Sequence, residues 1–177
     1  MTLWLYNPAM KLSLMFFTIG IFLVVLQTTV QRLLPLGPIV PDLILILCVY
    51  WGLHHPTVGA AVGSFLLGYS VDIISSRLLG INAFAMSLVF IAAYLGSRSI
   101  WLHHPIVSSI IVLLAALVKG LGLVLVWLLF LSTEGFWKGA VQYIAAEALI
   151  AAVLAPFMFA LFRRAESSLE RLQPAAQ

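Results

Sequence analysis

The sequence predicts an all-α integral membrane protein, built as a polytopic bundle of six transmembrane helices. Of its 177 residues, 63% are hydrophobic and only 8% are charged, and the mean hydropathy is +1.14. A soluble domain carries about 25% charged residues, so this composition excludes a soluble fold. The apolar residues also form continuous runs rather than an alternating pattern, which favours helices over a β-barrel.

Six apolar runs define the expected helices, in chain order. They cover about 12–31, 39–54, 57–74, 81–98, 105–131 and 139–162. At 1.5 Å per residue, runs of this size can cross roughly 30 Å of hydrocarbon, although the second and third runs are short. Residues 1–165 are therefore expected to form a single transmembrane domain, and residues 166–177 a short cytoplasmic tail.

The boundaries between the runs carry residues that end helices. The first run follows Lys11 and has no small-residue cleavage site at its end, so we interpret it as a retained helix rather than a signal peptide. Three prolines follow it, and Gly80 follows the third run. A His-His-Pro sequence ends both the second and the fourth run, and Ser-Thr-Glu-Gly separates the fifth from the sixth.

Basic residues predict the orientation, because they are enriched on the cytoplasmic side of a membrane protein. With both termini inside (N-in/C-in), more basic residues face the cytoplasm than the outside. The residues expected inside are Lys11, Arg98, Arg163, Arg164 and Arg171, and those expected outside are Arg32, Arg77 and Lys138. The net charge of +3 is too small and too dispersed to indicate nucleic-acid binding.

Two aspartates stand at the ends of the hydrophobic segment between them. Pro41 favours the first turn of a helix, which places Asp42 beside the positive end of the helix dipole. Asp72 is expected at the end of the third helix. A carboxylate at a membrane boundary is costly unless it is held there, so we expect both to form ion pairs at the outer side, near Arg32 and Arg77.

Lys119 and Glu147 are the ionisable residues well inside the apolar runs. Each lies about 14 residues from Thr133, so an antiparallel helix pair would bring them to the same depth. A lone charge at mid-bilayer costs about 3 kcal/mol, which favours a buried ion pair that sets helix register. A proton or ion relay, or a polar anchor for a partner helix, is the functional alternative. In a pair, losing one charge should be worse than losing both.

Other residues are assigned structural roles, with functional alternatives open. Small residues in the third run, Gly59, Gly63 and Gly68, predict close helix packing within the chain or a groove for another protein's helix. The paired histidines, His54/His55 and His103/His104, lack the further ligands of a tetrahedral metal site and are expected at headgroup level; the role of these pairs is open. Buried Cys48 is interpreted as a small core residue.

Enzymatic function is disfavoured by the absence of the usual motifs. The sequence has no G-x-S-x-G, no phosphate-binding glycine loop and no D-x-x-D cluster for Mg²⁺. We therefore predict no catalytic residues, no cofactor and no metal. A weaker alternative is an enzyme that uses Asp42 and Asp72 on a lipid-linked substrate.

Several of these residues together resemble the pattern of the rod shape-determining protein family MreD. The residues that carry the resemblance lie within 41–102 and form a P-D-L, Y-W, P, L-G-x-x-x-D and L-G series. They are Pro41-Asp42-Leu43, Tyr50-Trp51, Pro56, Gly63, Leu67-Gly68, Asp72 and Leu79-Gly80. The last two helices are similar to the family only in hydropathy.

The resemblance implies a non-enzymatic component of the bacterial cell-elongation machinery in the inner membrane. Proteins of that family work with MreC, RodA and a class B penicillin-binding protein, and indirectly with MreB, to control rod shape and lateral peptidoglycan synthesis. The alternative is a substrate-binding membrane subunit of an energy-coupling vitamin importer, in which the outer Asp/Arg group would hold a polar ligand. Such an importer needs a concave pocket with several convergent polar groups, and the sequence offers few.

Overall fold

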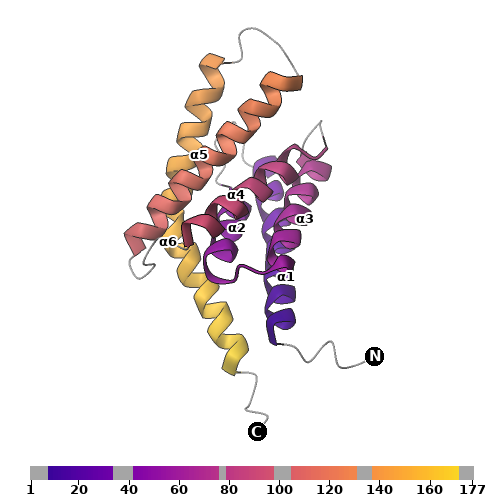
Figure 1. The fold of residues 1–177 in the computed structure, drawn as a ribbon, viewed down its shortest axis with the longest axis vertical. Helices are drawn as coiled ribbons and strands as arrows, with labels where there is room; N and C mark the ends of the chain where they lie inside the picture. Colours follow the sequence, from indigo (N-terminus) through magenta and orange to yellow (C-terminus); the bar gives the residue numbers. More distant parts are fainter. Residues whose placement is uncertain (1–7, 34–41, 76–78, 98–104, 131–136, 172–177) are drawn as a thin grey trace.

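A computed structural model describes residues 8–33, 42–75, 79–97, 105–130 and 137–171, and in this part of the chain it is all-helical (Figure 1). The prediction of an all-α fold with six helices is confirmed. The helices are α1 (Pro8–Leu33), α2 (Leu43–His54), α3 (Val58–Ser75), α4 (Ile81–Ser97), α5 (Pro105–Phe130) and α6 (Trp137–Arg171).

The helices are arranged around α2, which contacts each of the other five. On one side, α3 packs against α4 and α1; on the other, α5 and α6 form an antiparallel pair that extends beyond the rest of the molecule (Figure 1). Helix α4 joins the two sides because it contacts α2, α3 and α5. The start of α1 and the end of α6 lie toward the same end of the molecule (Figure 1).

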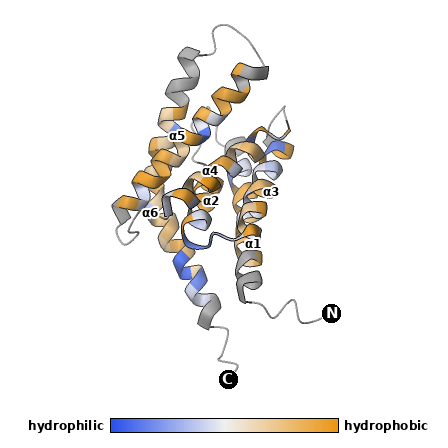
Figure 2. Ribbon diagram, viewed as in Figure 1, coloured by the Kyte–Doolittle hydropathy of each residue, from blue (hydrophilic) through white to orange (hydrophobic). Residues whose placement is uncertain are grey.

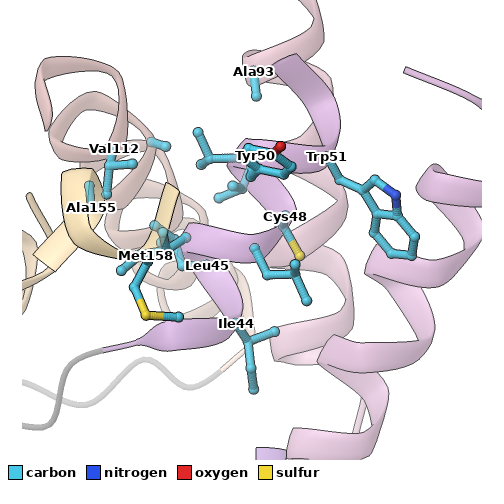
Figure 3. Close-up of a cluster of buried hydrophobic side chains, with 14 of the residues drawn as sticks. Ile44, Leu45, Cys48, Tyr50, Trp51, Ala93, Val112, Ala155 and Met158 are labelled. Carbon is cyan, nitrogen blue, oxygen red and sulfur yellow. The ribbon is translucent and has the colours of Figure 1, made fainter. Parts of the chain in front are cut away.

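Helix α2 is buried along nearly its whole length, and its sequence is apolar on every side for that reason. All ten residues from Ile44 to Leu53 are buried. In Figure 3, Trp51 projects from α2 toward the neighbouring helices, while Leu45 lies beside Met158 of α6. A helix that is hydrophobic all round belongs in the centre of a bundle. With 12 residues, α2 is about 18 Å long, which is shorter than a bilayer's hydrocarbon core.

The outside of the bundle is also apolar (Figure 2). Large hydrophobic side chains are exposed on α1, α3, α5 and α6, among them Phe22, Ile73, Leu121 and Phe157. Among the described residues, two apolar segments are long enough to cross a membrane, Val107–Val126 in α5 and Ile144–Ser168 in α6. Hydrophilic residues gather instead at the C-terminal end of α6 (Figure 2). This distribution points to a membrane protein.

The helix bounds differ most from the predictions at α2 and α6. Asp42 is the N-cap of α2, so this helix begins at Leu43 rather than near residue 39; Pro41 lies outside the described residues. Helix α6 continues to Arg171, well beyond the predicted end at 162. Its last turns are polar rather than apolar, which is why the hydropathy pattern alone missed them. The other four helices agree with prediction within a few residues.

Two of the three predicted packing glycines lie where helices touch. A Cβ on Gly63 would come within 2.6 Å of the indole of Trp51, and one on Gly68 within 2.6 Å of the backbone oxygen of Asn82. Both contacts are inside the chain, so at these two positions glycine allows α3 to approach α2 and α4 closely. Gly59, in contrast, is exposed. Gly80 has a φ of +97°, a left-handed conformation that favours glycine at the turn before α4.

We predict that Gly68→Ala destabilises the fold by about 1–3 kcal/mol, because the added methyl group meets backbone that cannot move independently. Gly96→Ala is the matched control, since nothing lies within 4 Å of a Cβ at that position of α4. Thermal unfolding of both variants in detergent measures the difference. Equal melting temperatures would contradict the close α3–α4 approach.

Candidate functional site

The candidate site begins at the N-terminus of α2, where Asp42 caps the helix. The backbone N–H of Leu45 donates to Asp42 Oδ1 at 3.0 Å. This N-cap bond satisfies one of the amide groups that have no partner within the helix, and the carboxylate faces the positive end of the helix dipole. Asp42 is only 3% exposed. Asp42 therefore lies beside a helix N-terminus, where the sequence analysis expected it.

The other oxygen of Asp42 binds Lys119 of α5. Lys119 Nζ donates to Asp42 Oδ2 at 2.6 Å and to Glu147 Oε1 of α6 at 2.8 Å. The ammonium thus joins three helices through two charge-assisted hydrogen bonds, which are stronger than neutral ones. The predicted Lys119–Glu147 pair is present, but it is part of a three-residue cluster that also includes Asp42.

The cluster corrects the expected ion-pair partner of Asp42. We expected this carboxylate at the outer boundary beside arginines, yet it contacts a lysine that lies inside the apolar segment Val107–Val126. The physical reason is the packing of the bundle: α2 contacts both α5 and α6, which places its N-cap beside Lys119. Arg77 lies outside the described residues, and the side chain of Arg32 is not described.

Burial differs among the three members. The side chains of Asp42 and Lys119 are 5% and 11% exposed, whereas that of Glu147 is 29% exposed. Glu147 borders a shallow recess between α5 and α6, whose other lining residues include Ala116, Gly120 and Ile144. A Cβ on Gly120 would come within 2.6 Å of Ile144, so glycine allows the two helices to approach beside the cluster.

Asp72 has a separate structural role, which is to cap α4. The backbone N–H groups of Gly80 and Ala83 donate to its Oδ2 at 2.9 and 3.1 Å. Its Oδ1 accepts bonds from both the backbone and the side-chain nitrogen of Asn82, at 3.1 and 2.9 Å. Asp72 is fully buried. Among the described residues, each aspartate thus has its own set of partners.

A second polar contact, which the sequence did not indicate, joins the C-terminus of α2 to α6. The hydroxyl of Tyr50 donates to Glu166 Oε2 at 2.8 Å. His55 Nε2 lies 2.7 Å from Glu166 Oε1, at ion-pair distance but without the alignment of a hydrogen bond. His54 stacks on Tyr50, with ring centroids 4.3 Å apart. Glu166 falls in the predicted tail, so no pattern in the sequence connected it with α2.

The remaining predicted residues are placed as follows. Trp51 is buried against Gly63, and Pro56 is exposed in the turn between α2 and α3. Cys48 is a buried free thiol, as expected of a core residue. His103 and His104 lie outside the described residues. Among the described residues, no group of three or more His, Cys, Asp or Glu side chains is arranged to hold a metal ion.

Comparison with known protein families shows which family this chain belongs to. The sequence model of the protein family "rod shape-determining protein MreD" matches residues 8–165, which is most of the chain. The chain belongs to the MreD family. No curated protein and no solved structure gives a match.

The MreD match extends the resemblance seen in the sequence. The residues that suggested the family lie between 41 and 102, whereas the family match includes α5 and most of α6. The charged cluster is therefore entirely inside the MreD region. Glu166 follows immediately after it. Membership of this family suggests a role in determining rod shape, and together with the apolar helices it indicates a membrane protein.

We predict that Lys119→Met destabilises the protein by about 3–5 kcal/mol, because it leaves two buried carboxylates without their cation. The matched control is the triple variant Asp42→Asn/Lys119→Met/Glu147→Gln, which removes all three charges and retains an N-cap side chain. Thermal unfolding in detergent should place the triple variant closer to wild type than Lys119→Met.

The presence of Asp42 also changes the expectation for the simpler double variant. Removing Lys119 and Glu147 together still leaves Asp42 buried and unpaired, so the double variant should not recover wild-type stability. A triple variant that is no more stable than Lys119→Met would contradict the three-residue cluster.

We predict that Asp72→Ala lowers stability by about 1–2 kcal/mol, because the N-terminal amides of α4 lose their acceptor. Asp72→Asn keeps one acceptor oxygen and should lose less. Cys48→Ala, at an equally buried position without such bonds, controls for burial. Unfolding midpoints in denaturant measure all three. Equal midpoints for Asp72→Ala and Cys48→Ala would exclude a capping role.

Proposed function

We propose that this protein is a non-enzymatic inner-membrane scaffold of the bacterial cell-elongation machinery, with several membrane crossings. In this proposal it binds MreC and the cell-wall synthases, RodA and a class B penicillin-binding protein, and acts on MreB indirectly. The observation that carries the proposal is the MreD family match over residues 8–165. The proposal goes further than that match by assigning partners and a mode of action.

The geometry supports a scaffold because the ionisable groups at its centre serve internal contacts. Asp42 and Lys119 hold α2, α5 and α6 together, and Asp72 holds the start of α4. A bundle fixed in this way presents rigid helix faces outward. The exposed faces carry large apolar side chains, which suit docking by the membrane helices of partners as well as contact with lipid.

The importer alternative receives less support. Its ligand group was expected to include Asp42 and Asp72, but both carboxylates are buried and engaged within the chain. The recess beside Glu147 is shallow and mainly apolar, whereas a small-molecule site needs a concave pocket with several convergent polar groups. The alternative of an enzyme that acts on a lipid-linked substrate relies on the same two aspartates. It is disfavoured for the same reason, because both carboxylates are buried and bonded within the chain.

We predict that the tagged full-length protein, purified from its native membrane in mild detergent, recovers MreC together with RodA or a class B penicillin-binding protein. The Gly68→Ala variant should recover less, because its α3–α4 contact is disturbed, whereas Gly96→Ala should match wild type. Mass spectrometry identifies and quantifies the partners. Recovery of an ATPase with its membrane coupling subunit, in place of MreC, would overturn the scaffold proposal in favour of the importer.

A further inference from the structure

The charged cluster has one acceptor that its members do not use. Asp42 accepts through both oxygens, from Leu45 and from Lys119. Glu147 accepts from Lys119 through Oε1 alone. In the part of the chain that the structure describes, no group donates to Glu147 Oε2, and this side chain is the most exposed of the three. The unused bonding capacity of the cluster is therefore at its outer edge.

The cluster is also unbalanced in charge. Two carboxylates and one ammonium sum to −1 when all three are ionised. The charges alternate along the line Asp42, Lys119, Glu147, so a cation placed beyond Glu147 would continue the alternation and bring the sum to zero. In a low-dielectric layer an unbalanced charge is costly, and ionisable residues there pair with others.

The recess beside Glu147 indicates what kind of cation fits. Its lining is apolar apart from Lys119 and Glu147, with small residues at Ala116, Gly120 and Ala148. A divalent metal ion requires about six oxygen ligands, which this lining does not offer. A lysine or arginine side chain fits better, because its hydrocarbon stem packs on apolar surface while its head reaches the carboxylate.

We propose that the α5–α6 face at this recess docks a membrane-spanning helix of a partner protein that carries a basic side chain within its apolar segment. The basic head group donates to Glu147 Oε2, and the small residues allow close approach of the partner helix. This inference rests on the proposed scaffold function, because it supplies one contact through which the scaffold binds a membrane partner.

The test uses two synthetic transmembrane peptides of leucine and alanine, identical except for lysine or leucine at the central position. Each is reconstituted with the full-length protein in phosphatidylcholine vesicles, and association is measured by energy transfer between fluorophores. The lysine peptide should bind roughly three- to twentyfold more tightly than the leucine peptide, the range measured for polar contacts between membrane helices.

Two variants locate the binding. Glu147→Gln keeps the shape and the acceptor for Lys119 but removes the charge, so the preference for lysine should disappear. Leu123→Trp fills the recess without changing any charge and should also abolish the preference. Ile73→Trp, at an exposed position of α3, is the control and should bind like wild type. Melting temperatures confirm that each variant is folded.

The outcomes separate this inference from the proposed function. Equal binding of the two peptides to the wild-type protein overturns the docking site, and so does a lysine preference that persists in Glu147→Gln. If MreC and the synthases still co-purify with the wild-type protein in either case, the scaffold function stands and only this contact is wrong. If they do not co-purify, the scaffold function fails independently of the peptide result.

Discussion

The contact of Lys119 with Asp42 and Glu147 is the interaction on which the rest of the structure depends. Helix α2 is too short to cross a bilayer by itself, and its N-terminus is buried inside the bundle. Exposed backbone amides are costly there, and Asp42 satisfies one of them as the N-cap. The cap itself carries a charge, which Lys119 neutralises at 2.6 Å. The cap of the central helix is thus paired with a cation from α5, and the same cation also binds Glu147 of α6.

This constraint organises the bundle around α2. Its N-terminus is joined to α5 and α6 through the charged cluster, and near its C-terminus Tyr50 binds Glu166 of α6. Helix α6 therefore makes polar contacts near both ends of α2. On the opposite side, Trp51 packs against Gly63 of α3, and α4 begins where Asp72 caps it. Fixed internal contacts leave the outward faces for lipid and for membrane partners, as the proposed scaffold function requires.

The sequence predicted the parts of this account that depend on local patterns. Continuous apolar runs predicted six helices, the equal distance of Lys119 and Glu147 from the α5–α6 turn predicted their pairing, and Pro41-Asp42 indicated a helix start. It did not predict that Asp42 meets Lys119, because residues 77 apart are brought together only by the packing of α2 against α5. Glu166 was missed because polar final turns of a helix look like a tail.

The most direct test is a solid-state NMR distance measurement in lipid bilayers, with ¹⁵N in lysine side chains and ¹³C in the carboxyl groups of aspartate and glutamate. The account predicts dipolar coupling from Lys119 Nζ to two carboxyl carbons, those of Asp42 and Glu147, each one C–O bond behind an oxygen that accepts a charge-assisted hydrogen bond from the ammonium. The coupling should be absent in Lys119→Met. Coupling to the Glu147 carboxyl alone, with none to Asp42, would contradict the account, because the cap of the central helix would then lack its cation.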